Sequence, residues 1–384
     1  MTNRELSILI PARNEMFLAR TIEDILQHIE ADTEVIAVLD GDLADPPIPQ
    51  HDRVNVIKLS KSIGQRAATN LACKLSKAKY VMKVDAHCAF DQGFDRKMLE
   101  AFKSTGDNVT MVPIMRNLWA FDWKCYHCGW KKYQGPTPKK CEQCGKSDKI
   151  KRKMLWIGKT NPQSTSYCFD STPHFQYFNE WKKNPTYKKD QKEKGLTETM
   201  SLQGSCWMLT RDKFWELNIS EEQFGGWGSQ GIEVACKTWL SGGRVLCNHT
   251  TWYAHMFRTQ GGDFSFPYQI SNSDQQKAQN YARDLFFNNA WPKQIHSLSW
   301  LVEKFWPVKG WTEEDLKKLK ENDKNLTLAL NETGQQPPTK RKQNSSNNTY
   351  SYTIAPSKGI IYYSDSLVNI KIEIEKQRSL TRNY

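Results

Sequence analysis

The sequence lacks any long apolar run. Its 384 residues contain no stretch of about 18 consecutive apolar residues, the length that a membrane-spanning helix needs. The first residues, MTNRELSILIPARNE, also lack the apolar core of a secretory signal peptide. These absences predict a protein that makes no membrane contact and is cytoplasmic, in the host cytoplasm if its source is viral.

The cysteines lack the pattern of a small secreted disulfide scaffold. Four of the ten form two C-x-x-C-G units with twelve residues between them. Four thiolates at this spacing are typical of a zinc ribbon, and a site closed by four protein ligands is structural and not catalytic. We expect one structural Zn²⁺ bound by Cys125, Cys128, Cys141 and Cys144.

Positive charge is concentrated in one part of the chain. The sequence has 54 Lys and Arg against 42 Asp and Glu, a formal net charge of +12. Residues 124–153 alone carry ten basic and two acidic side chains, a balance of +8, and a further run of six lysines lies within Lys182–Lys194. Such segments are either solvated surface or polyanion-binding surface.

Apolar patterning indicates an α/β fold with a mostly parallel, Rossmann-like sheet. In such sheets ligands bind at the carboxyl ends of the strands. The expected elements are strands at Leu6–Ile10, Thr33–Leu39, Val54–Leu59 and Tyr80–Val84 and helices at Asn14–Ile29 and Gln65–Lys77.

Composition then divides the chain into six segments. A helical extension at 266–330 has Thr312 as a helix cap, and the tail contains one strand and one helix, which either dock on the main domain or begin a second one. The segments are a nucleotide-sugar-binding half (1–120), the zinc-ribbon insert (121–153), an acceptor and metal half (154–265), the helical extension (266–330), a polar linker (331–357) and the tail (358–384).

The triplet Asp85-Ala86-His87 follows a predicted strand. On an extended strand end, side chains two residues apart point to the same side, so both can bind one divalent cation. A surface aspartate beside an unrelated histidine is the alternative, because D-x-H triplets are common by chance.

Six segments in the same order resemble the polypeptide N-acetylgalactosaminyltransferases and, more broadly, the inverting family-2-type glycosyltransferases. The resemblance covers roughly residues 5–118 and 200–260. It implies a GT-A fold, a UDP-sugar donor, and Mn²⁺ or Mg²⁺ at the active site. The segments are L-S-I-L-I-P-A-R-N-E (Leu6–Glu15), E-V-I-A-V-L-D-G-D (Glu34–Asp42), S-I-G-Q-R-A-A-T-N (Ser62–Asn70), V-D-A-H-C (Val84–Cys88), G-W-G-S-Q-G-I-E (Gly226–Glu233) and W-Y-A-H-M-F-R (Trp252–Arg258).

The resemblance also implies residue roles. Asp85, His87 and His255 take the positions of the metal ligands, with His249 as a rival for the third. Asp40 and Asp42 are candidates for contacting uracil and ribose, and Arg66 for a phosphate or ribose contact, although the family's arginine in A-R-N is Thr69 here. The implied donor-binding set is Pro11, Arg13, Glu15, Asp40, Asp42, Arg66, Asn70 and Asp85.

The candidate catalytic residues are Trp227, Gln230 and Glu233. Trp227 is expected near the donor sugar, or else in the core. Inverting members carry an acidic pair whose carboxylate acts as general base, and Gln230–Gly231 stands there instead. The polypeptide transferases retain the anomeric configuration and need no such base, so the sequence favours retention, with Glu233 as an alternative base.

The insert suggests the class of acceptor. Lysines and aromatic residues in the insert, including Tyr126 and Tyr133, offer phosphate contacts and stacking faces for nucleic acid. The leading hypothesis is therefore transfer to a 5-hydroxymethylpyrimidine base in DNA, as bacteriophage glycosyltransferases do. A protein or surface-glycan acceptor and an inactive binding protein on the same fold remain the alternatives.

Overall fold

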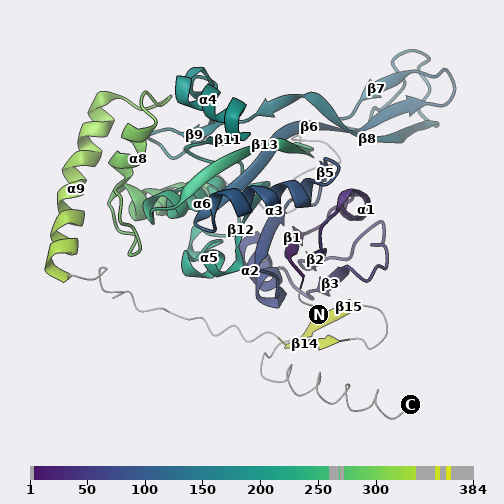
Figure 1. Ribbon diagram of the computed structural model, residues 1–384. Helices are drawn as coiled ribbons and strands as arrows, with labels where there is room; N and C mark the ends of the chain where they lie inside the picture. The colour runs from purple at the N-terminus through teal and green to yellow at the C-terminus, as the bar shows by residue number, and fades with distance from the viewer. Residues whose placement is uncertain (1–3, 259–267, 269–271, 334–350, 355–359, 365–384) are drawn as a thin grey trace, which may run out of the picture.

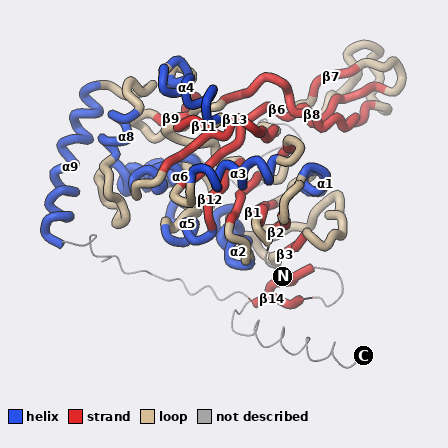
Figure 2. Tube along the Cα trace, viewed as in Figure 1, coloured by secondary structure: helices blue, strands red, loops and turns tan. Residues whose placement is uncertain are grey.

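The structure is a computed structural model that describes residues 4–258, 268, 272–333, 351–354 and 360–364. Within these residues, thirteen strands form one mixed sheet, with β9 and β10 apart as a hairpin (Figures 1 and 2). The strands are β1 (Leu6–Ala12), β2 (Thr33–Leu39), β3 (Val54–Lys58), β4 (Tyr80–Val84), β5 (Cys88–Phe90), β6 (Val109–Cys125), β7 (Lys131–Tyr133), β8 (Ile150–Ser164), β9 (Tyr167–Phe169), β10 (Phe175–Tyr177), β11 (Leu196–Glu198), β12 (Cys206–Thr210), β13 (Arg244–His255), β14 (Ser351–Ile354) and β15 (Ile360–Ser364).

Helices lie over the sheet and at one end of it (Figure 1). Helix α2 packs on β1 and β2, whereas α3 and α6 pack on β13 and β6. None of the described helices combines the length and the apolarity needed to cross a bilayer. The helices are α1 (Leu18–His28), α2 (Gln65–Leu75), α3 (Phe94–Thr105), η1 (Trp181–Lys183), α4 (Pro185–Lys194), α5 (Arg211–Glu216), η2 (Glu222–Phe224), α6 (Gln230–Leu240), α7 (Asn272–Ala282), η3 (Arg283–Phe287), α8 (Leu298–Lys304) and α9 (Glu313–Thr333).

The predicted strand and helix alternation is confirmed in the N-terminal part of the sheet. Strands β1 and β2 are buried at every residue, as expected of strands covered on both faces. Strand β1 pairs in parallel with both β2 and β4, so these three strands end at the same edge. Helix α1 begins at Leu18 and not at Asn14, because Asn14 has a left-handed φ of 46° that no helix accommodates.

The insert predicted at residues 121–153 is not a separate module. Its strands continue the main sheet. Strand β6 pairs with β13 in the sheet and then continues outward, with β8 on one side and β7 on the other. We call this projection, residues 118–158, the arm (Figure 1). An apolar cluster that includes Phe17, Phe121, Trp156 and Met256 fixes its base against the main domain.

The helical extension belongs to the same core as the sheet. Phe286, Leu301 and Trp311 are buried in the main apolar cluster. The predicted cap is confirmed: the Thr312 hydroxyl accepts a hydrogen bond from the Asp315 N–H at 3.1 Å, and the Asp315 carboxylate accepts one from the Thr312 N–H at 3.0 Å.

The C-terminal segments differ from the expectation. Helix α9 extends to Thr333 and β14 lies at 351–354, both inside the expected linker. In the tail, β15 pairs in parallel with β3 and antiparallel with β14, so this strand docks on the main sheet. The predicted tail helix lies outside the described residues.

Asp95 supports the amino-terminal edge of the sheet, opposite the edge where β1, β2 and β4 end. Its buried carboxylate accepts hydrogen bonds from the N–H groups of Glu30 (2.9 Å) and Ala31 (3.0 Å) and from the Thr33 hydroxyl (2.7 Å). The carboxylate therefore satisfies three donors in the turn that leads into β2.

We predict that Asp95→Ala lowers the free energy of unfolding by about 3 kcal/mol, because buried donors lose their acceptor. Urea denaturation followed by circular dichroism measures this loss. Glu23→Ala, which removes an exposed ion pair with Arg20, is the control and should cost less than about 1 kcal/mol. Equal stability of Asp95→Ala and the parent would contradict the assignment.

Candidate active site

Three candidate metal ligands from distant parts of the chain meet at one point. Asp85 follows β4, His87 precedes β5, and His255 ends β13. The His255 Nε2 atom lies 3.1 Å from His87 Nε2 and 3.3 Å from Asp85 Oδ2, and His87 Nε2 lies 3.8 Å from the same oxygen. One ligand atom from each residue therefore lies within 4.8 Å of the others, a spacing that a single cation can span.

Strand pairing produces this convergence. β13 runs antiparallel to β5, with His255 opposite Cys88, and parallel to β6, with His255 opposite Asn117. The Asp85 N–H donates to the Ser205 carbonyl at 2.8 Å, which fixes the end of β4. Backbone hydrogen bonds thus bring the three residues to one point of the sheet.

The protonation states suit a metal site. Burial lowers the pKa of His87 and of His255 to about 4, so both rings are neutral at pH 7 with a free nitrogen lone pair. Burial alone would raise the pKa of Asp85, but Lys83 and the two histidines outweigh it and the pKa lies below its usual range. The set is therefore a carboxylate and two neutral imidazoles, which suit a divalent transition metal.

Glu15 contacts the outer ring nitrogen of His87, and Arg258 in turn contacts Glu15. The Glu15 carboxylate lies 3.3 Å from His87 Nδ1, the ring atom opposite the one facing His255. Arg258 contacts the other oxygen of Glu15. A carboxylate on the outer nitrogen of a metal-binding histidine fixes the ring orientation and its tautomer.

Lys83 is a site residue that the sequence analysis missed. Its side chain is buried, contacts the Asp85 carboxylate, and donates to the Gly204 carbonyl at 2.9 Å. The available signal was a lysine between Met82 and Val84 in an otherwise apolar strand, two residues before Asp85. A charged side chain in such a strand requires a buried partner.

Two adjoining hollows surround the metal ligands. The first, of about 290 Å³, contains all three ligands, and the second, of about 300 Å³, extends from Asp85 toward α6 and α7. Both hollows are lined by Gln65, Asp85, Gln203 and Trp227. Trp227 and Asp85 therefore lie where the two spaces meet.

The structure brings part of the predicted donor-binding set to the first hollow. Pro11, Glu15 and Asp85 line it. Asp40 does not, because its carboxylate accepts hydrogen bonds from the Ser62 hydroxyl and the N–H groups of Ile63 and Gly64, at 2.6–3.0 Å. Asp40 thus shapes the loop before α2.

The remaining donor candidates also lie outside both hollows. Arg13 donates to the Asp40 carbonyl at 3.0 Å, and Asp42 is exposed. Asn70 donates to the Ser220 carbonyl at 3.1 Å. His249, the rival metal ligand, hydrogen-bonds Thr197 at 2.9 Å and is not part of the ligand cluster.

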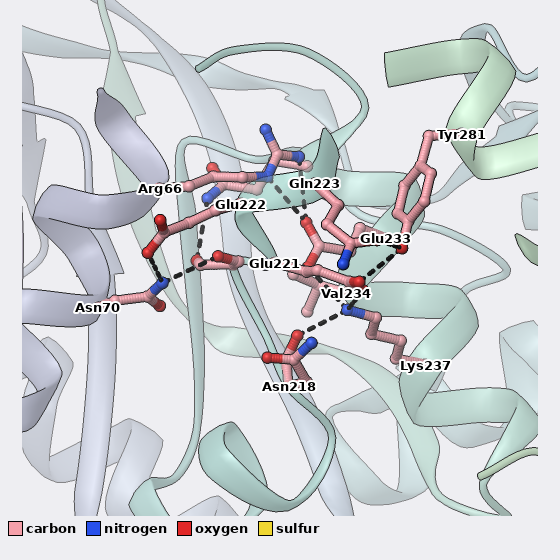
Figure 3. A network of polar contacts seen from close by, with 12 residues as sticks. Arg66, Asn70, Asn218, Glu221, Glu222, Gln223, Glu233, Val234, Lys237 and Tyr281 are labelled. Atoms are coloured by element: carbon pink, nitrogen blue, oxygen red, sulfur yellow. Dashed lines mark hydrogen bonds and ion pairs between the residues drawn. The ribbon is translucent and has the colours of Figure 1, made fainter. Parts of the chain in front are cut away.

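Arg66 and Glu233 are placed differently from the sequence expectation. Both side chains are at most 1% exposed and form an ion pair at 3.0 Å, to which Lys237 adds a second contact with Glu233 at 3.1 Å (Figure 3). Neither residue lines a hollow, so Glu233 is not positioned as a base and Arg66 is not positioned at a phosphate. Of the predicted catalytic residues, Trp227 and Gln230 line the second hollow.

The four cysteines of the arm form a second cluster. Cys125 Sγ lies 3.7 Å from Cys144 Sγ, and Cys128 Sγ lies 3.5 Å from Cys141 Sγ. The glycine after each pair has a left-handed φ, 80° at Gly129 and 71° at Gly145, and each N–H returns to the first cysteine's carbonyl at 2.9 Å. These tight turns explain the C-x-x-C-G pattern, and all ten cysteines of the chain are free of disulfides.

Comparison with known proteins agrees with this geometry. Residues 7–151 match the sequence profile of the family described as glycosyl transferase family 2. A Drosophila melanogaster protein named putative polypeptide N-acetylgalactosaminyltransferase 13 is 23% identical over 315 residues, which cover 77% of this chain and 48% of that protein. The chain thus spans about half the length of this curated relative.

A solved structure shares the fold. The crystal structure of GalNAc-T7 with UDP, GalNAc and Mn²⁺ superposes with a TM-score of 0.54 at 15% sequence identity, covering 86% of this chain and 57% of the other. The predicted fold class is confirmed in its coarser form, a GT-A-like α/β fold with a largely parallel sheet around β1. Residues 7–151 of the chain are thus similar to the glycosyl transferase family 2 domain.

Proposed function

We propose that the protein is a metal-dependent glycosyltransferase that moves a sugar from a UDP-sugar-like donor to an acceptor hydroxyl. The observation that carries this proposal is the convergence of Asp85, His87 and His255 in a hollow at the carboxyl ends of β1 and β4. Ligands bind at this edge in open α/β sheets. The family match over residues 7–151 supports the same activity.

The residues of the first hollow would bind the donor. Mn²⁺ or Mg²⁺ held by the three ligands would supply positive charge to the diphosphate, both in binding and as it leaves. Glu15 orients His87 through the outer ring nitrogen, and Lys83 keeps Asp85 ionised. Trp227 separates the donor from the second hollow, in which we place the acceptor.

The lining of the second hollow favours retention of configuration. Within the described part of the chain, Asp85 is the only carboxylate that lines this hollow, and Asp85 belongs to the metal cluster. Gln230 lines it at the position where inverting relatives carry an acid, and an amide cannot accept the acceptor's proton. Glu233 is buried in ion pairs, so among the residues that the structure describes no second carboxylate reaches this hollow.

For the acceptor, we propose a 5-hydroxymethylpyrimidine base in DNA, bound with the help of the arm. The strand register places Lys131, Lys124 and Lys151 next to one another across β7, β6 and β8. Like charges directly opposite in a sheet are destabilising, and a row of phosphates would neutralise them. Exposed Tyr126 lies against Lys124 of the arm, and exposed Tyr133 lies against Lys159, the residue that follows the arm.

The four arm cysteines would bind one structural Zn²⁺ in this proposal. Their sulfur atoms are close enough to share one ion, and four thiolates leave no position for substrate. The metal would hold the two cysteine turns together within the arm, which projects from the main domain (Figure 1).

The metal site gives the first test of this function. His87→Ala, His255→Ala and Asp85→Asn should each abolish Mn²⁺ binding and Mn²⁺-dependent hydrolysis of UDP-N-acetylgalactosamine, measured by calorimetry and by release of UDP. Glu15→Gln should weaken Mn²⁺ binding by roughly 10- to 100-fold, because it removes the partner that orients His87.

His249→Ala is the matched control for these variants, because His249 is a half-buried histidine on the same strand as His255 but outside the ligand cluster. It should keep the parent's Mn²⁺ affinity. Full metal-dependent activity in His255→Ala would refute the ligand assignment.

The zinc assignment predicts about one zinc atom per purified chain by elemental analysis. Cys141→Ser should lose this zinc and make the arm sensitive to limited proteolysis, while Cys236→Ala, in the buried helix α6, should retain it. A zinc-free preparation whose arm resists the protease as well as the parent would show that the assignment is incorrect.

The DNA proposal predicts that salt weakens binding through the lysine row. Replacing Lys124, Lys131 and Lys151 by glutamine should reduce the slope of log affinity against log salt by about 3, since each phosphate contact contributes roughly 0.9. The same triple change at the exposed Lys317, Lys318 and Lys320 of α9, outside both basic segments, is the control and should leave the slope unchanged.

Fluorescence anisotropy with hydroxymethylated and unmodified duplexes measures both variants. An unchanged slope in the arm variant would exclude this role for the lysines. If the enzyme transferred sugar to a peptide pool or a glycan but not to hydroxymethylated DNA, the acceptor would be that peptide or glycan and not DNA. No transfer and no donor hydrolysis would favour an inactive binding protein.

A further inference from the structure

A group of buried charges lies beside the second hollow and has no part in the chemistry proposed above. Arg66 of α2 contacts Glu233 Oε2 at 3.0 Å, and Lys237 contacts Glu233 Oε1 at 3.1 Å and Glu221 at 2.9 Å (Figure 3). The side chains of Arg66, Glu233 and Lys237 are at most 1% exposed. Two cations and two carboxylates thus balance one another inside the protein.

The same network holds the chain that leads to Trp227. Arg66 Nη2 donates to the Gly228 carbonyl at 2.7 Å, and Nη1 donates to the Gly225 carbonyl at 3.3 Å. These two carbonyls bracket Trp227 in the sequence. Upstream, Lys237 donates to the Asn218 carbonyl at 2.6 Å, and the Glu221 N–H donates to Glu233 at 2.8 Å.

The bracketed loop needs external support. Gly225 and Gly228 have φ values of 89° and 101°, and Gly226 is exposed. Glycine loses the most backbone freedom on being fixed, so a loop with three glycines around one tryptophan has little intrinsic preference for one conformation. The two hydrogen bonds from the Arg66 guanidinium favour one loop conformation over the others.

We propose that Arg66 is a positioning residue: its ion pair with Glu233 clamps the 225–229 loop so that Trp227 forms the wall between the donor hollow and the acceptor hollow. The loop positioning is independent of the chemistry, but its consequence for catalysis rests on the function proposed above. Lysine in place of Arg66 keeps the charge for Glu233 but lacks the planar fork that reaches both carbonyls.

The test follows Trp227 directly. In protein labelled with 5-fluorotryptophan, the ¹⁹F resonance of Trp227 is identified among the 14 tryptophans by its loss in Trp227→Phe. In Arg66→Lys this resonance should shift and broaden, because the loop samples more conformations, while tryptophans outside the loop's surroundings keep their positions. Identical Trp227 resonances in Arg66→Lys and the parent would overturn the proposal.

A second variant covers the case in which Arg66→Lys does not fold. Tyr281→Phe removes a hydroxyl 2.6 Å from Glu221 at the far side of the network and keeps the ring against Phe224. It should move the Trp227 resonance in the same direction by a smaller amount. An unmoved resonance in a folded Tyr281→Phe would count against the network as the support of the loop.

Asp95→Ala is the control for general destabilisation, because Asp95 lies at the opposite edge of the sheet. It should leave the Trp227 resonance unchanged. A shift in Asp95→Ala equal to that in Arg66→Lys would reduce the effect to loss of stability and overturn the specific role.

Activity provides the catalytic readout separately. Turnover of UDP-N-acetylgalactosamine with Mn²⁺ should fall by up to roughly 100-fold in Arg66→Lys, because a small misplacement near the reacting atoms is costly, while Mn²⁺ affinity stays at the parent's value. If the parent shows no turnover but its resonance responds to Arg66→Lys, the proposed function fails and the clamp stands. If turnover is normal and the resonance does not respond, the clamp alone fails.

Discussion

The candidate site depends on the pairing of β13 with its neighbours. His255 is 170 residues from Asp85 in the sequence, yet the register of β13 with β5 and β6 leaves it 3.3 Å from the Asp85 carboxylate. A slip of one residue would turn His255 to the other face of the sheet. Consecutive residues of β13 are buried at Val245–Asn248 and again at Tyr253–His255, so a slip would disrupt packed side chains on both faces of the strand.

Short-range sequence patterns predicted those strands and turns whose formation depends on neighbouring residues. The strands β1, β2 and β4 were predictable because their apolar runs require burial, and the turns at Cys125 and Cys141 because C-x-x-C-G closes a tight knuckle. The start of α1 was predicted four residues too early, since helical spacing does not reveal that Asn14 adopts a left-handed conformation. The convergence of Asp85 and His87 with His255 came from family resemblance and not from spacing.

Long-range electrostatics could not be read from the sequence. The identities of Arg66 and Glu233 suggested chemistry, but a contact across 167 residues pairs them in the interior. For Lys83, the apolar strand around it indicated that it has a buried partner. The sequence did not indicate that this partner is Asp85. A buried charge is constrained by its partner, so the role of such a residue is determined only when the fold brings the partner to it.

The hairpin of β14 and β15 has a consequence for the far edge of the sheet. Strand β15 pairs along β3, so the backbone N–H and C=O groups on that side of β3 are engaged within the chain. An uncovered β3 would offer a ready template to a strand of another molecule, which is how exposed edges promote aggregation. The hairpin thus moves the edge of the sheet from the largely buried strand β3, which contains valine and isoleucine, to β14, so that β3 itself offers no open edge at Val56–Lys58 for self-association.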